Sequence, residues 1–266
     1  MPEPQFLPRA RFQRLIDALR AERYRCVGPR VRDGAIIFDE LVSADQLPVG
    51  YRDRQAPGYY RLKESGEKRL FGWANGPQAL KPLLFATRET LWRYERSEDS
   101  GLGFEPVLPE VQPLAVFGVR SCDLAALAIH DAHFLNRLPP DPHYERRRRG
   151  LFVVAVNCSH PAETCFCAST GDGPGARGGY DLLLDELDDG FVVRAGSGPG
   201  ERILAGLGLG PAGAGQVEEA ESQVRRAAAL QKRELPGRDL YRPLFDNLDH
   251  PRWQEVAQRC LSCGNC

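Results

Sequence analysis

Two apolar runs, LAVFGV (114–119) and LFVVAV (151–156), constrain the fold of this chain more than any other feature. Each is typical of a buried strand, and the segment between them, CDLAALAIHDAHFL (122–135), carries apolar residues at helical spacing. Pro139 and Pro140 end that helix. A strand, a helix and a strand within about 40 residues predict a right-handed βαβ crossover with parallel strands.

Cysteines follow both of these runs. Cys122 comes just after the first, and Cys158, Cys165 and Cys167 lie in the turn NCSHPAETCFC (157–167) that follows the second. Functional loops of open α/β sheets lie at the carboxyl ends of the strands. We therefore expect the four thiols to meet at one sheet edge. Thiolates select zinc or iron–sulfur clusters, and four of them complete either kind of site.

The spacing of these cysteines favours an iron–sulfur cluster. Zinc sites typically use two tight pairs of ligands, whereas here a lone cysteine joins a C-x6-C-x-C run. A cluster whose irons are several ångströms apart tolerates such scattered ligands. The alternative is a zinc-stabilised interaction module without a redox role. Buried structural cysteines are less favoured, because clustered free thiols are open to oxidation.

A second cysteine group, Cys260, Cys263 and Cys266, ends the chain with C-x2-C-x2-C spacing. This is the opening of the ferredoxin run C-x2-C-x2-C-x3-C-P, without its fourth cysteine. We expect residues 246–266 to begin a truncated 4Fe-4S ferredoxin-like domain, and residues 1–245 to form an α/β iron–sulfur electron-transfer domain. The predicted fold class is α+β, a mixed sheet with a βαβ unit and several hairpins, followed by the start of that module.

Other elements are predicted from periodicity and turn residues. The pattern predicts an amphipathic helix over 9–20, a hairpin over 23–42 with its turn at Asp33-Gly34, and a loop over 45–58. A second hairpin is expected to pair GYYRL (58–62) with RLFGWA (69–74), and a third to cover 180–196. An exposed helix is expected over 216–234.

Several weaker features give no firm site. GSGPG (196–200) follows a strand, but Glu201 takes the third glycine position of G-x-G-x-x-G, which argues against a free-standing nucleotide-binding oxidoreductase. The run Arg146–Arg149 is typical of a solvated loop, and less often of a docking patch. His130 and His133 are expected at the surface, with tuning of a cluster as the alternative. Cys26 stands apart and has no assigned role.

Composition excludes some classes of protein. A formal net charge of −1 over 266 residues shows no basic excess, so we expect no nucleic-acid partner. No apolar run reaches the roughly 20 residues of a membrane helix, and the N-terminal residues show no apolar segment of a signal peptide. We therefore expect a cytoplasmic protein with no membrane partner, whose cysteines are kept as thiols.

Five stretches together resemble a known family. They are GPQALKPLLF (76–85), FGVRSCDLAAL (117–127), DPHYERRRR (141–149), NCSHPAETCFCASTGDGPGARGGYDLLLDEL (157–187) and CLSCGNC (260–266). With them the chain resembles the iron–sulfur beta subunit of soluble NiFe-hydrogenases (sulfhydrogenases), and equally the A-type iron–sulfur subunit of anaerobic sulfite reductases. The similarity runs over most of the chain, and the combination of Cys122 with the turn 157–167 is its specific part.

The resemblance implies an electron-transfer subunit of an oxidoreductase complex, with no substrate chemistry of its own. Such a subunit relays electrons between the catalytic subunit of a hydrogenase or sulfite reductase and a flavin- and NAD(P)-binding reductase subunit. The resemblance also implies [4Fe-4S] clusters, one of them held by Cys122, Cys158, Cys165 and Cys167. It implies a C-terminal two-cluster ferredoxin domain as well, nearly all of which this chain lacks, so the clusters expected there are incomplete.

Overall fold

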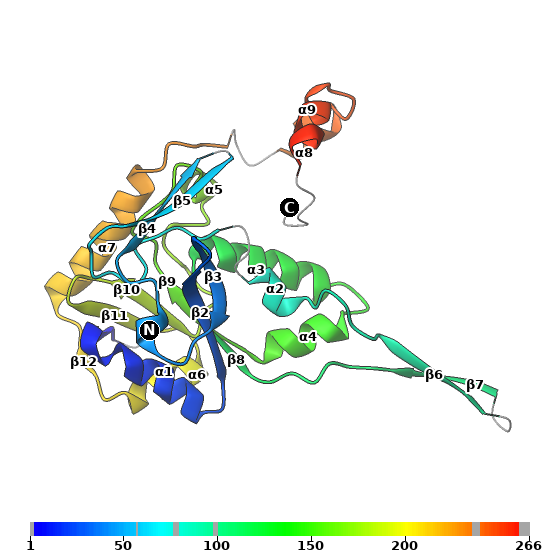
Figure 1. Cartoon of the computed structure of the whole chain (residues 1–266), viewed down its shortest axis with the longest axis horizontal. Coiled ribbons are helices and arrows are strands. Elements are labelled where there is room, and N and C mark those ends of the chain that lie inside the picture. The colour runs from blue at the N-terminus through cyan, green and yellow to red at the C-terminus, as the bar shows by residue number, and fades with distance from the viewer. Residues whose placement is uncertain (1–2, 57, 77–79, 98–100, 236–239, 261–266) are drawn as a thin grey trace.

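The structure is a computed structural model that describes residues 3–56, 58–76, 80–97, 101–235 and 240–260 (Figure 1). Its centre is an eight-stranded mixed sheet. The strands are β1 (Gln5–Pro8), β2 (Arg25–Arg32), β3 (Ala35–Glu40), β8 (Leu114–Val119), β9 (Leu151–Val156), β10 (Leu182–Glu186), β11 (Gly190–Ala195) and β12 (Gly210–Pro211). Their order is β12-β1-β11-β10-β9-β8-β2-β3. The predicted α+β class with a mixed sheet is confirmed.

The predicted βαβ unit is also confirmed. Strands β8 and β9 are parallel neighbours joined through α3 (Ser121–Phe134), and every residue of both strands is buried. Strand β2 pairs with β8 and strand β10 with β9, both in parallel. Gly118 has a φ of +82° where the β8–β9 register shifts, and a Cβ there would lie 3.2 Å from the Phe71 ring. Both the positive φ and this close approach favour glycine.

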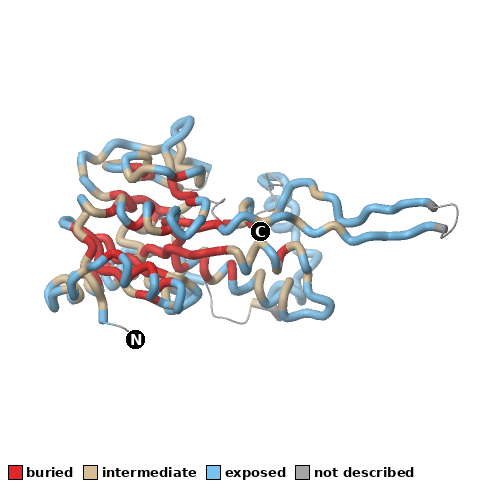
Figure 2. The backbone as a smooth tube through the Cα atoms, turned by 90° about the horizontal axis from the view of Figure 1, so that it is seen from below, coloured by how far each residue is buried: buried red, intermediate tan, exposed pale blue. Residues whose placement is uncertain are grey.

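Helices cover both faces of the sheet. Buried side chains of α1 (Phe12–Ala21) and α6 (Gly198–Gly206) join one core cluster, and those of α2 (Lys81–Leu84), α3 and α4 (Pro142–Arg149) join the other. Helix α7 (Ala214–Ala229) packs through Ala220 against Val192 of β11. Buried residues concentrate in these layers (Figure 2). The described chain also forms the helices η1 (Arg9–Arg11), η2 (Ala44–Gln46), α5 (Cys167–Thr170), α8 (Tyr241–Phe245) and α9 (Arg252–Arg259).

The predicted fold class includes several hairpins, and the described residues form four. The pair β2–β3 turns at Asp33 and Gly34, whose φ angles of 50° and 74° are those of a type I′ turn, and β10–β11 is the predicted third hairpin. The other two are separate ribbons, β4 (Tyr51–Ala56) with β5 (Tyr59–Glu64) and β6 (Trp92–Ser97) with β7 (Gly101–Pro106). The second of these was not predicted.

The predicted second hairpin is wrong in its partner. Strand β5 pairs with β4, which lies within the expected loop 45–58, and residues 69–74 form no strand. We call residues 69–74 the strap. It is largely buried in the core, with Phe71 and Trp73 each 1% exposed. A buried backbone needs hydrogen-bond partners, so the strap must find them elsewhere than in a sheet.

Three charged side chains supply those partners. The Glu186 carboxylate accepts the Leu70 and Phe71 N–H groups at 2.6 and 2.8 Å, and Asp53 accepts the Ala74 N–H at 2.6 Å. The Arg120 guanidinium donates to the carbonyl oxygens of Phe71 and Trp73, both at 2.8 Å. Side chains distant in sequence thus replace a neighbouring strand.

The arginine run is a helix and not the expected loop. Asp141 caps α4 by accepting the N–H groups of His143 and Tyr144, with Pro142 in the first turn. Arg147 pairs with Glu89 and Arg148 with Asp131. These two arginines therefore fix α4 to its surroundings.

The last described residues, 240–260, lie outside the sheet. Helices α8 and α9 stand apart from it in Figure 1, and the described residues from Arg242 to Cys260 are exposed. The predicted residues Cys263 and Cys266 lie outside the described part of the chain. The expected ferredoxin-like module over 246–266 therefore stays a prediction.

Candidate functional site

The four predicted cysteines lie in the segments that follow the carboxyl ends of β8 and β9. Cys122 is the second residue of α3, which begins directly beyond β8. Cys158 follows β9, and Cys167 begins α5 at the other end of the cysteine turn. The βαβ crossover thus brings Cys122 and the turn to one sheet edge, as expected from the parallel strands.

A glycine contact connects Cys167 to the start of α3. A Cβ added at Gly173 would lie 2.3 Å from the Ser121 hydroxyl oxygen and 2.8 Å from the Cys167 sulfur. Both side chains therefore approach the same point of the loop 171–175, and only glycine leaves room for them. The same loop accepts the Cys158 N–H at the Pro174 carbonyl oxygen, at 3.2 Å.

Burial and neighbouring groups raise the pKa of three of these thiols. Desolvation raises the pKa of Cys122 well above its usual range, although the residue is exposed by surface area. Asp123 and then the thiols of Cys167, Cys158 and Cys165 raise it further. Burial likewise raises the pKa of Cys158 and of Cys165. Without a compensating positive charge, this edge of the sheet disfavours thiolates.

Arg120 provides one fixed positive charge at this edge. It is 2% exposed, lies between the end of β8 and the start of α3, and holds the strap through two carbonyl oxygens. Its guanidinium also donates to the Asn157 carbonyl oxygen at 3.3 Å and lies 4.9 Å from the centre of the Trp73 ring. Its charge opposes the rise in the pKa of Cys158.

Gln231 contacts the end of the cysteine turn and was missed by sequence reasoning. Its amide nitrogen donates to the Cys167 sulfur at 3.3 Å, and its oxygen accepts the Ala168 N–H at 3.0 Å. Two residues on, Arg233 donates to the Glu163 carbonyl oxygen at 3.0 Å. The segment after α7 therefore binds along the cysteine turn. Nothing in its sequence marks this contact, which arises from the tertiary fold.

The described residues contain no group of three or more His, Cys, Asp or Glu side chains placed to hold a single metal ion. The convergence of Cys122, Cys158, Cys165 and Cys167 into one ligand set thus stays a prediction. So do the ligand roles of Cys260, which is exposed, and of Cys263 and Cys266, which are not described. The roles of these three terminal cysteines rest on spacing and resemblance.

The weaker features have structural explanations. Ser197 caps α6 by accepting the Gly200 N–H, and a Cβ at Gly200 would lie 1.9 Å from the Asp181 carbonyl oxygen. Close helix packing therefore accounts for this glycine. His130 contacts the rings of Phe85 and Tyr144. Cys26 is buried, and desolvation raises its pKa to about 11, as for an inert thiol of the core.

Comparison with known proteins gives one informative similarity. No protein-family profile matches the chain, and no solved structure matches it. The chain is 30% identical over 249 residues to the sulfhydrogenase 2 subunit beta of Pyrococcus furiosus. This alignment covers 91% of the chain and 64% of the relative. The chain thus spans less than two thirds of that protein's length. No helix among the described residues is long and apolar enough to cross a membrane.

Proposed function

Because the chain belongs to the hydrogenase beta-subunit family, we propose that it is an electron-transfer subunit whose Cys122, Cys158, Cys165 and Cys167 hold one [4Fe-4S] cluster. The observation that carries the proposal is that the β8–α3–β9 crossover places Cys122 and the turn 157–167 at one sheet edge, where the Cys167 sulfur and the Ser121 hydroxyl both lie close to Gly173. Being a subunit, the protein works with other chains.

The residues at this edge fit such a group by their chemistry. Four thiolates are the usual ligand set of a [4Fe-4S] cluster. Ligands of a single zinc ion would have to lie about 2.3 Å from one centre, whereas a cluster spreads its irons and accepts sulfur atoms that stand farther apart. Bound iron would supply the positive charge that favours the thiolate form of these cysteines.

When bound, an iron–sulfur cluster accepts and releases single electrons at a potential set by its surroundings. Two residues of the chain would act on that potential, and a third residue lets a loop lie close to Cys167. Arg120 places a buried positive charge near Cys158, which favours the more negative, reduced state. Gln231 donates a hydrogen bond to the Cys167 sulfur, which acts in the same direction. Gly173 lets the loop 171–175 cover the site closely.

The wider roles belong to the same proposal. Electrons pass between a catalytic subunit of hydrogenase or sulfite reductase type and a flavin- and NAD(P)-binding reductase subunit. Residues 1–245 form the electron-transfer domain, and residues 246–266 begin a ferredoxin-like domain to which Cys260, Cys263 and Cys266 contribute ligands.

Metal analysis of anaerobically purified protein tests the cluster. Replacing Cys122 by Ser is expected to lower both iron and acid-labile sulfide by about four per chain, the content of one [4Fe-4S] cluster. Cys26→Ser is the matched control, since this thiol is buried apart from the site, and its iron content should stay at the wild-type level. Iron-free protein with one equivalent of zinc per chain would instead establish the zinc-stabilised module.

A further inference from the structure

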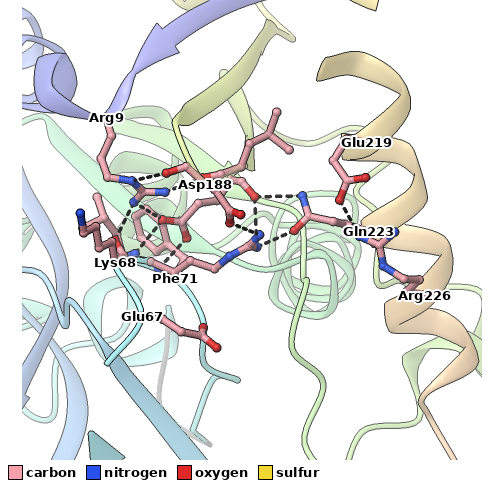
Figure 3. A network of polar contacts seen from close by, with 12 residues as sticks. Arg9, Glu67, Lys68, Phe71, Asp188, Glu219, Gln223 and Arg226 are labelled. Carbon is pink, nitrogen blue, oxygen red and sulfur yellow. Dashed lines mark hydrogen bonds and ion pairs between the residues drawn. The ribbon is translucent and has the colours of Figure 1, made fainter. Parts of the chain in front are cut away.

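A cleft lies beside the cysteine turn. Its volume is about 530 Å³, and Ser159 and His160, which follow Cys158 directly, form part of its wall. The rest of the wall comes from η1, from β4, from the residues after β5, from the loop after β10 and from α7. Figure 3 shows Arg9 and Lys68 on one side of this region and Gln223 and Arg226 of α7 on the other.

Positive side chains dominate the wall of this cleft. Its five cations outnumber its two carboxylates, Glu67 and Asp188. Two further carboxylates, Glu186 and Glu219, bind two of the cations from outside the wall. Even with these counted, one positive charge is left over. The five cations are Arg9, Arg52, Lys68, Arg69 and Arg226.

Lys68 is the cation left over. It is exposed and lines the cleft, and no carboxylate among the described residues lies within ion-pair distance of its ammonium group. Lys68 does contribute its carbonyl oxygen to the wall, where it accepts a hydrogen bond from Arg9 at 2.9 Å. The ammonium group is therefore available to an anion that enters.

The arginines of the cleft are held in place before any ligand binds. The side chains of Arg9 and Arg69 are only 18% and 21% exposed. Arg69 pairs with Asp188 at 3.0 Å and donates to Gln223. Arg52 lies between Glu67 and the His160 ring nitrogen, and its buried Nε has no partner among the described residues. Fixed donors cost little entropy on binding.

The lining also indicates the class of ligand. Apart from the His160 ring, no aromatic or aliphatic side chain among the described residues lines the cleft, so it offers no apolar anchor for a protein segment. Arginine forks and a lysine ammonium are the usual donors to phosphate oxygens. We propose that this cleft binds a compact oxyanion of the phosphate or diphosphate class.

Titration calorimetry of the full chain with inorganic pyrophosphate at low ionic strength tests the proposal. Lys68→Gln and Arg226→Gln are expected to weaken binding about tenfold each, the effect of losing one phosphate contact. Arg225→Gln is the matched control. It removes the same charge from the neighbouring position of α7, but Arg225 pairs with Glu221 and does not line the cleft. Its affinity should stay within about twofold of wild type.

Two further ligands identify the source of the anion. ADP binding tighter than pyrophosphate in the same cleft would indicate a nucleotide tail, and equal affinities would indicate a free oxyanion; adenosine alone should not bind. Pyrophosphate binding no stronger than that of chloride at equal ionic strength would overturn the proposal. So would equal weakening by Arg225→Gln and Lys68→Gln. None of these measurements requires iron in the protein, so their outcome is separate from that of the cluster proposal.

Discussion

The two separate ribbons of this protein, β4–β5 and β6–β7, have the same local design and opposite surroundings. Each is an antiparallel pair of six-residue strands in unbroken register. The ribbon β4–β5 contacts the edge strand β3, whereas β6–β7 projects from the body (Figure 1). An isolated hairpin is at best marginally stable in water, so the two ribbons differ in what supports them.

Polar contacts fix β4–β5 to the body. The Asp53 carboxylate is 6% exposed and accepts the Ala74 N–H of the strap at 2.6 Å and the Gln55 amide at 2.8 Å. The Tyr60 hydroxyl accepts the Ile36 N–H of the edge strand β3 at 3.2 Å. This ribbon therefore joins the strap, the sheet edge and the cleft to one another.

The ribbon β6–β7 has an apolar face with nothing from the described residues on it. The cross-strand pair Tyr94 and Phe104 is 71% and 66% exposed, and Trp92 beside it is 62% exposed. The opposite face carries the pair Arg93 and Glu105. Alternating apolar and polar residues are thus enough to form a ribbon. Holding a ribbon against the rest of the fold takes specific contacts, and β6–β7 does not make them with the described residues.

Removing the Asp53 carboxylate should have the largest effect on this difference. Asp53→Ala leaves the buried Ala74 N–H without its acceptor, and we expect the free energy of unfolding to fall by about 3 kcal/mol. Urea denaturation followed by circular dichroism measures it. Glu95→Ala removes a carboxylate from the other ribbon and should cost less than about 0.5 kcal/mol. Equal losses would show that the two ribbons are supported alike.

Hydrogen exchange should separate the ribbons by a somewhat smaller amount. Cross-strand amides of β6–β7 can exchange by local opening, whereas those of β4–β5 must also break the contacts of Asp53 and Tyr60. We expect exchange in β6–β7 to be faster by a factor of about 30, or about 2 kcal/mol in opening free energy. Mass spectrometry of peptides 51–64 and 92–106 measures both. Similar protection would mean that β6–β7 is covered in solution.

The Tyr60 hydroxyl should contribute about 1 kcal/mol, the usual value of one hydrogen bond. Tyr60→Phe leaves the Ile36 N–H of the edge strand β3 without its partner. The control Tyr94→Phe removes a hydroxyl from an exposed ring of the other ribbon and should leave stability unchanged. Chemical denaturation of both variants and of wild type measures the free energy of unfolding. An unchanged value for Tyr60→Phe would mean that water replaces the lost hydrogen bond.

The ribbons also show what could be predicted from sequence. The βαβ unit was predictable because its strands are continuous apolar runs and its helix has regular spacing, so local pattern and tertiary role agree. The strap was not, because RLFGWA is apolar enough for a strand while its backbone partners, Glu186 and Arg120, are distant in sequence. For β6, the alternation in LWRYER (91–96) is a signal from which the strand could have been found.

Some residues of the candidate site could likewise be predicted from the sequence, and others could not. The cysteines were identified by residue type, by spacing and by their position after two predicted strands. Arg120 and Gln231 were not, since only the folded chain brings a guanidinium behind Cys158 and an amide onto the Cys167 sulfur. The cleft was equally hidden, because its cations come from separate segments of the chain. Sequence patterns thus identify ligands more readily than the residues around them.

The smallest expected effect is a change in alkaline stability. Burial raises the pKa of Tyr60 above its ordinary value of 10, although the hydrogen bond with Ile36 lowers it in part. The folded protein therefore holds this proton more tightly than the unfolded chain does. Its contribution is complete below the unfolded pKa and is lost as the pH rises above about 10.

Tyr60→Phe should accordingly flatten the fall in unfolding free energy between about pH 9 and pH 11. Burial also raises the pKa of Tyr24, Tyr144 and Tyr180, so a common slope remains in every variant. Tyr94→Phe should keep the full wild-type slope. Urea midpoints across this range, for wild type and both variants, provide the comparison. If Tyr60→Phe kept the wild-type slope, the ring would be hydrated in solution, and β4–β5 would resemble β6–β7 more closely than its contacts indicate.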